Sequence, residues 1–290
     1  MINELHKLQK RRGECLGELL NRLLIILNNG KENSTYYHIA NILLRNFNSI
    51  KNMTISDIAD LCFVSKSTIS KFARYIGFGD FLEMKSAATY RSNKSSNNLN
   101  YKDNILSYME NHTEEEYIDV IIDDLKLAKS SINMSKIDAL VENLFKYDKV
   151  AAFGLLYSES AAMDLQMKLA YNEKYIITHI NDVEQNEFIK NADKDTLIII
   201  FTNSGNYIKK YQLITAGNID KNVFKQTKAK IVAITANKEI EKHPYVDLCI
   251  TYEHASSIQT HPILFQLITD FIAFRYKKRK NEEAKVWVNK

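Results

Sequence analysis

The chain has 290 residues, 45% of them hydrophobic, a length and composition that predict about two globular domains, each with its own core. The formal net charge of +4 comes from residues 1–90, which hold 12 Lys and Arg against 8 Asp and Glu, whereas the remaining residues are balanced. No apolar run reaches the ~18 residues of a membrane-spanning helix, and the opening segment, MINELHKLQKRR, lacks the apolar core of a signal peptide. Three isolated cysteines, Cys15, Cys62 and Cys249, lack metal-ligand spacing, so we expect a cytoplasmic protein without a metal or other cofactor.

The first ninety residues have helical patterns throughout. Leucines between residues 16 and 27 repeat at helical spacing, and residues 36–47, YYHIANILLRNF, predict a second amphipathic helix. Residues 54–81, TISDIADLCFVSKSTISKFARYIGFGDF, then predict two short helices joined by an apolar turn at Cys62, Phe63 and Val64. Ser65 is a suitable N-cap for the second of these helices, and Gly77 is a suitable residue to end it.

The second helix of this pair divides into an apolar and a polar face. A period of 3.6 residues directs Ile69, Phe72, Ala73 and Ile76 inward and a basic, hydroxyl-rich set outward. This division is typical of a DNA-recognition helix, whose exposed N-terminal residues meet base edges in the major groove. We assign base contacts to Ser67, Thr68, Ser70 and Lys71, phosphate contacts to Lys66, Arg74 and Tyr75, and include Ser65 in the DNA-binding set. The alternative is a helical hairpin in a bundle whose surface happens to be basic.

The polar run RSNKSSNNLN at 91–100 predicts a linker between two domains. We therefore predict a helical domain at 1–90, a connecting segment at 91–113, an α/β domain at 114–282 and a tail at 283–290. Helical patterns at about 114–132 and 135–146 precede five short apolar runs, which alternate with helical segments and lie at 150–153, 175–180, 196–201, 230–235 and 247–251. Such runs are typical of strands buried on both faces, so the predicted architecture is a three-layer sandwich around a five-stranded parallel sheet.

Loops after the strands of such a sheet are the places to look for a ligand. The strand TLIIIF is followed by Thr202, Asn203, Ser204, Gly205 and Asn206, which precede a helix. Hydroxyls, a glycine and the free amides of a helix N-terminus together suit a phosphate or another anion. A weaker candidate is the loop GLLYSES at 154–160, with Ser158 and Ser160. Neither loop has the lysine of a nucleotide-binding P-loop, and the alternative is that both are ordinary turns and helix caps.

The two halves together resemble the RpiR-type bacterial transcriptional regulators, which join an N-terminal helix-turn-helix domain to a C-terminal sugar isomerase (SIS) domain. MTISDIAD and VSKSTISKFARYIGFGDFLEMK carry the resemblance over about residues 35–90, and AAFGLLYSESAAMDLQMKL and LIIIFTNSGN carry it over about residues 120–280. The resemblance implies a regulator whose DNA affinity is set by a phosphorylated sugar. It makes Ser158, Thr202, Asn203, Ser204, Gly205 and Asn206 the candidate phosphosugar contacts. Leu156 and Tyr157 depart from the family pattern, so a degenerate SIS domain used only for oligomerisation is an alternative.

Related SIS domains catalyse isomerisation, which needs a base beside the substrate carbon. The candidate bases are Glu159, Glu253, His254 and His261, and each is more simply a surface residue or a cap. Because a predicted DNA-binding domain is fused to the α/β domain, we predict that the α/β domain senses a ligand, and we assign no catalytic residue. A palindromic operator requires two DNA-binding domains related by a two-fold axis, so we expect at least a dimer, formed mainly through the α/β domain.

Overall fold

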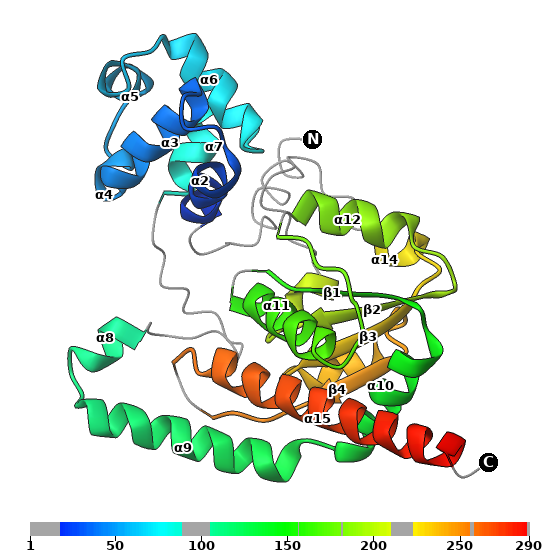
Figure 1. The fold of residues 1–290 in the computed structure, drawn as a ribbon. Coiled ribbons are helices and arrows are strands. Elements are labelled where there is room, and N and C mark those ends of the chain that lie inside the picture. Colours follow the sequence, from blue (N-terminus) through cyan, green and yellow to red (C-terminus); the bar gives the residue numbers. More distant parts are fainter. Residues whose placement is uncertain are drawn as a thin grey trace, which may run out of the picture. The chain divides into compact units, whose positions relative to one another are not determined.

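The computed structural model describes residues 18–88, 105–155, 157–180, 182–209, 223–255 and 258–288. These residues form two compact units, one helical and one α/β, and each is described by itself (Figure 1). Both the predicted linker at 91–100 and Leu156 lie outside the described residues. Among the described helices, none combines the length and the apolar character that a membrane span requires.

The first unit is entirely helical, as its sequence patterns predict. Its helices are α2 (Glu18–Asn29), α3 (Thr35–Arg45), α4 (Phe47–Ile50), α5 (Ile55–Leu61), α6 (Lys66–Tyr75) and α7 (Phe81–Ser86). Leu23, Ile39, Leu43, Ile58 and Phe72 lie fully buried in one shared core. Because these side chains come from four different helices, the amphipathic face of each helix is stabilised by its neighbours rather than by helix propensity alone.

The second unit is built around a parallel sheet. It contains α8 (Ile105–Met109), α9 (Glu114–Ser131), α10 (Met134–Lys146), β1 (Lys149–Phe153), α11 (Tyr157–Ala170), α12 (Asp182–Asn191), β2 (Thr196–Phe201), α13 (Asn206–Lys209), α14 (Val223–Gln226), β3 (Lys230–Thr235), a 3-10 turn η1 (Lys238–Lys242), β4 (Leu248–Thr251) and α15 (His261–Val288). The strands pair in the order β1-β2-β3-β4, all parallel. Their carboxyl ends therefore meet at one edge of the sheet, and the loops after them lie side by side.

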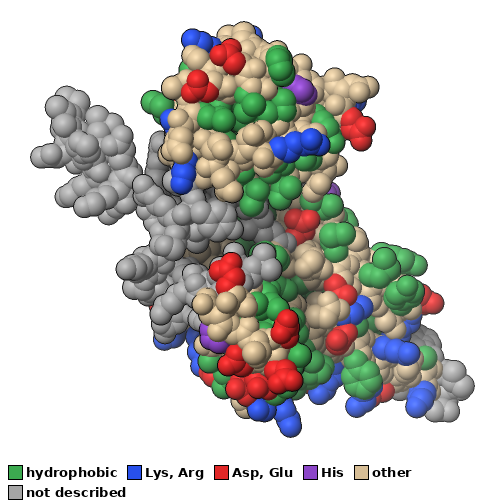
Figure 2. All heavy atoms as spheres, turned by 90° about the vertical axis from the view of Figure 1, so that its left-hand side faces the viewer, with side chains coloured by type: hydrophobic (Ala, Val, Ile, Leu, Met, Phe, Trp, Pro, Cys, Tyr) green, Lys and Arg blue, Asp and Glu red, His purple; other side chains and the backbone are tan. Residues whose placement is uncertain are grey.

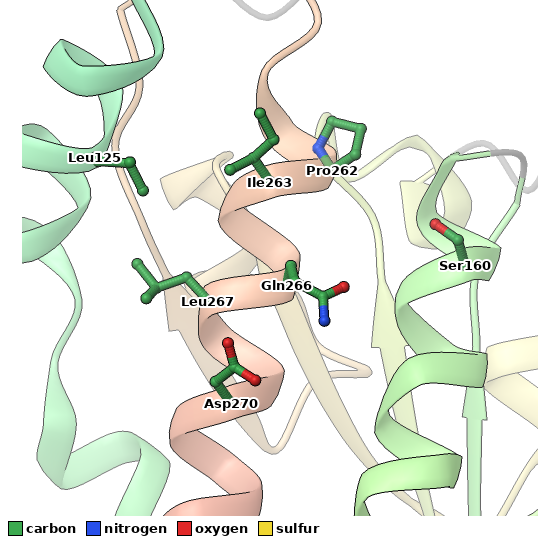
Figure 3. A pocket seen from close by; sticks show the side chains of 7 residues that line it. All are labelled: Leu125, Ser160, Pro262, Ile263, Gln266, Leu267 and Asp270. Carbon is green, nitrogen blue, oxygen red and sulfur yellow. The ribbon is translucent and has the colours of Figure 1, made fainter. Parts of the chain in front are cut away.

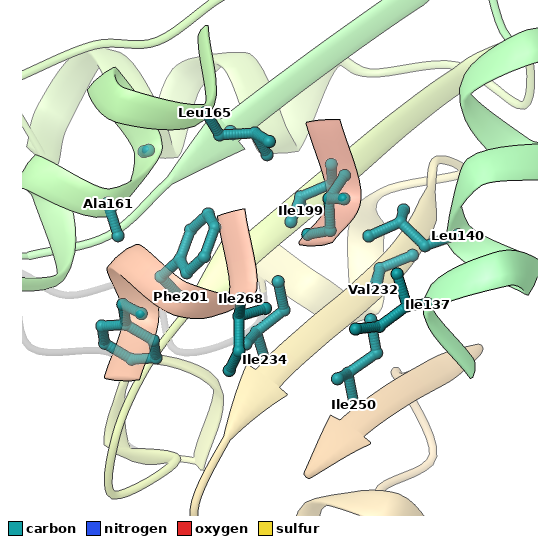
Figure 4. Close-up of a cluster of buried hydrophobic side chains, with 14 of the residues drawn as sticks. Ile137, Leu140, Ala161, Leu165, Ile199, Phe201, Val232, Ile234, Ile250 and Ile268 are labelled. Carbon is teal, nitrogen blue, oxygen red and sulfur yellow. The ribbon is translucent and has the colours of Figure 1, made fainter. Parts of the chain in front are cut away.

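Helices cover both faces of this sheet. Phe153 of β1 meets Phe188 of α12 with ring centroids 5.4 Å apart, and Phe201 of β2 meets Phe265 of α15 at the same separation. Since Phe153 pairs with Ile200, Phe201 points to the opposite face. Figure 4 shows the core on the α15 side, where Leu140 of α10 and Leu165 of α11 belong to the same cluster as the inward residues of β2, β3 and β4. The predicted three-layer α/β class is confirmed.

The sheet has four strands within the described residues rather than the predicted five. Residues 175–180 form only one parallel bridge to β1, in which the Ala152 amide donates to the Ile177 carbonyl at 2.8 Å and the Ile177 amide donates to the Val150 carbonyl at 2.8 Å. Ile176 is buried, whereas Tyr175 and Ile177 are exposed. This segment lies beside β1 at the edge of the sheet, and within the described residues its Tyr175 and Ile177 side chains stay largely unpacked.

Candidate functional sites

The paired helices α5 and α6 both begin with a side-chain N-cap, of which the one at Ser65 was predicted. The Thr54 hydroxyl accepts the Asp57 amide at 3.2 Å while the Asp57 carboxylate accepts the Thr54 amide at 2.7 Å, a capping box that lowers the pKa of Asp57. At the start of α6 the Ser65 hydroxyl accepts the Thr68 amide at 3.1 Å and shares a hydrogen bond of 2.9 Å with the Thr68 hydroxyl. The predicted N-cap at Ser65 is therefore present, and both hydroxyls take part in it.

The turn between these helices consists of Cys62, Phe63 and Val64, as predicted, but the three apolar side chains differ in exposure. Cys62 is buried, and burial raises the pKa of its thiol to about 11, so the thiol is unreactive at neutral pH. Phe63, in contrast, is 89% exposed and has a positive φ of 55°. The Val64 amide donates to the Ala59 carbonyl at 2.9 Å, which closes α5 in the arrangement that requires a left-handed residue at position 63.

The outer face of α6 is polar and basic, as predicted. Lys66, Ser67, Lys71, Arg74 and Tyr75 are exposed and Thr68 and Ser70 are half-buried, whereas Ile69, Phe72 and Ala73 are buried. The exposed Tyr75 ring lies against Tyr36 of α3 on one side, with centroids 4.6 Å apart. All eight predicted DNA-binding residues thus lie on one helix and its N-cap.

A buried arginine that sequence reasoning missed supports the other end of α6. Arg22 of α2 is 4% exposed, donates from Nη1 to the Ile76 carbonyl at 2.8 Å and lies 4.0 Å from the centre of the Phe78 ring. A cation at a helix C-terminus is favourable because the last carbonyls carry partial negative charge. The sequence signal that could have identified Arg22 is its position as a charged residue among the apolar residues of α2, between Leu19 and Leu23.

In the α/β unit, the loop after β2 begins with residues that point into the protein. Thr202 and Asn203 are buried, Ser204 and Asn206 are half-buried, and Gly205 has φ of +76°. The Thr202 hydroxyl accepts the Tyr207 amide at 3.4 Å, and the Ser204 hydroxyl accepts the Asn206 amide at 3.3 Å. These long bonds cap the start of α13, so both hydroxyls already have a structural role at the position that we predicted for an anion.

The loops after β3 and β4 hold this segment in place. The Tyr252 hydroxyl donates to Asn203 Oδ1 at 2.6 Å, and the Thr235 hydroxyl donates to the Asn203 carbonyl at 3.0 Å. Asn237 Nδ2 donates to the Ser204 carbonyl at 2.9 Å. Asn203 is therefore turned toward the neighbouring strands, and Asn237 and Tyr252 are site residues that sequence reasoning did not identify.

The loop after β1 packs closely on the helix that follows it. A Cβ atom on Gly154 would lie 2.4 Å from the Ser158 carbonyl oxygen, so only glycine permits this approach. Ser158 is buried, whereas Tyr157 is exposed and its ring edge faces His261 at a centroid distance of 6.1 Å.

Gln185 of α12, fully buried, joins the loops after β1 and β2. Its Nε2 donates to the carbonyls of Gly154 at 3.0 Å and His179 at 2.6 Å, and its Oε1 accepts the Tyr207 hydroxyl at 2.6 Å. The structure thus links the two predicted ligand loops through one amide. Sequence could not reveal it, since Gln185 lies in a polar helical segment with nothing to mark it as buried.

Two candidate bases are carboxylates in different surroundings. Glu159, half-buried in the first turn of α11, has its pKa raised by burial to about 7. Glu253, just after β4, forms an ion pair with Lys238, and its amide donates to the Ser131 hydroxyl at 2.9 Å. The raised pKa of Glu159 suits proton transfer near neutral pH.

The two candidate histidines are held neutral. Burial lowers the pKa of His254, an effect that nearby Asp124 opposes. Burial, together with His254, lowers the pKa of His261 to about 4. Asp124 also accepts the Ala255 amide at 2.7 Å and the Thr260 hydroxyl at 2.5 Å, which fastens α9 to the start of α15. Among the described residues, no group of His, Cys, Asp or Glu is arranged to hold a metal ion.

An open groove of about 480 Å³ runs along α15 between α9 and α11 (Figure 3). Its lining is mostly apolar and consists of Leu125, Pro262, Ile263 and Leu267 with Ser160, Gln266 and Asp270. None of the predicted phosphosugar residues lines it. The groove therefore belongs to the outer face of α15 rather than to the loops at the strand ends.

A capped recognition helix in one unit and a parallel sheet with polar loops in the other define the class of two-domain helix-turn-helix regulators. Residues 22–94 match the helix-turn-helix domain of the rpiR family. Along its length the chain is 21% identical, over 279 residues, to an uncharacterised HTH-type transcriptional regulator in the aarA 3' region of Providencia stuartii, covering 93% of this chain and 94% of that protein.

Two solved structures are also similar. The Vibrio vulnificus NanR protein complexed with ManNAc-6P is 14% identical with a TM-score of 0.46, and the match covers 92% of this chain and 97% of that one. The sugar isomerase domain of an RpiR transcription factor from Sphaerobacter thermophilus is 14% identical with a TM-score of 0.45, covering 61% of this chain and 97% of that domain.

Proposed function

We propose that this regulator binds operator DNA through α6 and that a phosphorylated sugar, bound at the loops after β1 and β2, changes its operator affinity. The observation that carries the proposal is the exposed face of a capped α6, where Lys66, Ser67, Lys71 and Arg74 lie together. In a helix-turn-helix complex the first turns of such a helix enter the major groove. Ser67, Thr68, Ser70 and Lys71 then contact bases.

The residues flanking these contacts bind the DNA backbone. Lys66 and Arg74 supply positive charge for phosphates, Tyr75 supplies a hydroxyl beside them, and Ser65 keeps the helix start ordered. Each phosphate neutralised releases counterions, so affinity falls steeply with salt.

The experiment that tests DNA binding uses the full chain and a duplex selected by it from a random pool. Lys71→Ala is expected to weaken binding to that duplex by about 1–3 kcal/mol and to relax the preference for one base pair, as the loss of a base contact implies. Lys51→Ala is the matched control, since it removes the same charge from an exposed position outside α6. Equal losses in both variants would contradict the assignment of α6.

A sugar phosphate is the ligand class that the likeness of LIIIFTNSGN to the phosphosugar loop of SIS domains supports. The geometry is compatible with it, because Ser204 and Asn206 are only half-buried at the start of α13, where backbone amides favour an anion. Thr202, Asn203 and Gly205 shape the loop, and Ser158 lies in the first turn of α11, after the neighbouring strand β1. An anion would replace the long intraloop bonds to the amides of Asn206 and Tyr207.

Titration with a panel of hexose and pentose phosphates, with inorganic phosphate for comparison, tests this site. Ser204→Ala is expected to weaken the preferred sugar phosphate about tenfold, the effect of one lost hydrogen bond to a charged group. Ser130→Ala, an exposed serine of α9 in the same unit, is the control. Operator binding that responds to no sugar phosphate would leave a domain that serves oligomerisation only.

We propose sensing rather than turnover for the α/β unit. The histidines are neutral and Glu253 is paired with Lys238, whereas burial raises the pKa of Glu159 to about 7. An isomerase is the alternative that this carboxyl favours. Incubation of the purified chain with each sugar phosphate distinguishes them, since interconversion abolished by Glu159→Gln would identify an enzyme.

We also propose that the protein self-associates, because a palindromic operator binds two DNA-binding domains. The groove on α15 continues into exposed apolar residues of α9, Ile118 and Ile122, and suits a second copy of this chain. Figure 2 shows acidic side chains gathered on this unit, where α9 has Glu114, Glu115 and Glu116 in its first turn. Sedimentation velocity is expected to show a dimer that Ile263→Glu dissociates and Tyr171→Glu, a change of an exposed apolar residue outside the groove, does not.

A further inference from the structure

Phe63 combines two unusual properties at the turn of the helix-turn-helix. Its side chain is 89% exposed, the largest exposed fraction among the large hydrophobic residues described, and its φ of 55° lies in the left-handed region. Most residues with positive φ are glycines because a Cβ atom is strained there, and an exposed aromatic ring is itself unfavourable in water. Such an outlier is expected where a side chain has a use outside the fold.

The ring has no role in the core of its own unit. The backbone hydrogen bonds that close α5 come from the Phe63 and Val64 amides, and glycine would make both. The neighbours of Phe63 show the contrast, since Cys62 is buried and Val64 is half-buried against the core. The turn therefore needs the backbone of residue 63 but not its side chain.

Phe63 lies close to the proposed DNA contacts. It precedes the N-cap Ser65 by two residues and Lys66 by three, so the Cα atoms of Phe63 and Lys66 are at most ~11 Å apart. The major groove that receives the start of α6 is ~12 Å wide, with thymine methyl groups on its floor and deoxyribose on its walls. Phenylalanine makes apolar contacts of this kind in DNA complexes. In Figure 2, hydrophobic side chains are visible on the surface of the helical unit among Lys and Arg.

We propose that Phe63 is a DNA-contact residue whose ring packs on the apolar surface of the duplex next to the point where α6 enters the major groove. The inference rests on the proposed docking of α6 and extends that interface to the turn. It gives the turn a specificity role when the ring meets a thymine methyl group and an affinity role when it meets deoxyribose.

The test compares Phe63→Gly and Phe63→Ala in the full chain on a duplex selected from a random pool by the wild type. Both variants are expected to bind that duplex about tenfold more weakly, as the loss of one buried apolar contact implies. Phe63→Gly is expected to melt at the same temperature as the wild type or higher, because glycine relieves the positive φ. Equal losses of binding in the two variants, despite different melting temperatures, would assign the effect to the ring.

Leu82→Ala is the matched control, since Leu82 is a 71% exposed hydrophobic residue of α7 in the same unit. If the Phe63 variants lose affinity for the selected duplex alone, and the wild type loses affinity when thymine in that duplex is replaced with uracil, the ring contacts a thymine methyl group. If the variants also lose affinity for an unrelated duplex, the ring contacts deoxyribose. Unchanged affinity in both Phe63 variants overturns the inference. If Lys71→Ala also leaves DNA affinity unchanged, the proposed docking of α6 is wrong as well. If Lys71→Ala weakens binding and the Phe63 variants do not, only the role of Phe63 is refuted.

Discussion

Replacing Gly205 with alanine tests how the loop after β2 is built. Gly205 has φ of +76°, and a Cβ atom there would lie 2.6 Å from both Cγ1 and Cδ1 of Ile240, a buried residue of η1. The left-handed conformation costs an alanine about 1–2 kcal/mol. Forcing a methyl group into a packed site typically costs a further ~1–3 kcal/mol. We therefore expect Gly205→Ala to destabilise the α/β unit by about 2–5 kcal/mol.

Two comparisons separate the backbone cost from the steric cost. In an Ile240→Ala background the overlapping atoms are absent, so the added cost of Gly205→Ala should fall to the ~1–2 kcal/mol of the backbone alone. Gly79→Ala is the control glycine, because its Cβ would meet only the carboxylate end of Glu83, at 3.0 Å, and its φ is not in the left-handed region. Because Gly79 belongs to the helical unit, its effect is measured on the unfolding free energy of that unit, where Gly79→Ala should be nearly neutral.

The assay is native-state hydrogen exchange of the β2 and β3 amides in the full chain, which reports the unfolding free energy of this unit separately from the helical unit. Sugar phosphate binding should weaken in Gly205→Ala as the start of α13 shifts. A cost below ~1 kcal/mol, or the same cost with and without Ile240, would refute the reasoning, since it would mean that neither the left-handed backbone nor the contact with η1 constrains the loop.

Three further changes test other parts of the structure. At pH 8 the half-buried carboxylate of Glu159 is ionised at a cost, so Glu159→Gln should raise the unfolding free energy by about 2 kcal/mol, less than the full ~3 kcal/mol of the pKa shift because solvent screens a half-exposed group. This gain should shrink as pH falls through 7 and vanish below about 4.5, where the carboxyl is protonated in both the folded and the unfolded chain; a gain independent of pH in urea titrations would contradict the raised pKa. Arg22→Met should destabilise the helical unit by about 2–3 kcal/mol, measured by thermal unfolding, because the last carbonyls of α6 lose a buried charged donor; a neutral result would show that water replaces it. Tyr207→Phe removes the hydroxyl that donates to Gln185 Oε1, so it should lower the unfolding free energy by about 1–2 kcal/mol and weaken sugar phosphate binding. A loss of stability with unchanged sugar phosphate affinity would show that this hydrogen bond does not support the ligand site.

Much of the fold followed from patterns within single elements. The period of 3.6 residues placed Ile69 and Phe72 inside and Lys71 and Arg74 outside, because a helix fixes the direction of each side chain relative to its neighbours. Runs such as TLIIIF became strands buried on both faces for the equally local reason that no polar side chain interrupts them. The segment at 175–180 was predicted as a strand but forms only one bridge to β1. The number of neighbours that such a segment has depends on the rest of the fold, which its own composition does not specify.

The sequence by itself determined the helix-turn-helix, its N-cap at Ser65, the parallel α/β class and the position of the polar loop after β2. Only the tertiary structure decided which side chains meet across the chain: Gln185 with the loop of Tyr207, Asn203 with Tyr252, and Arg22 with the end of α6. These pairs are separated by 22 to 54 residues, so no local periodicity encodes them. They form because the packing of the core brings the elements together, and buried polar groups then find whichever partners the fold has placed within reach.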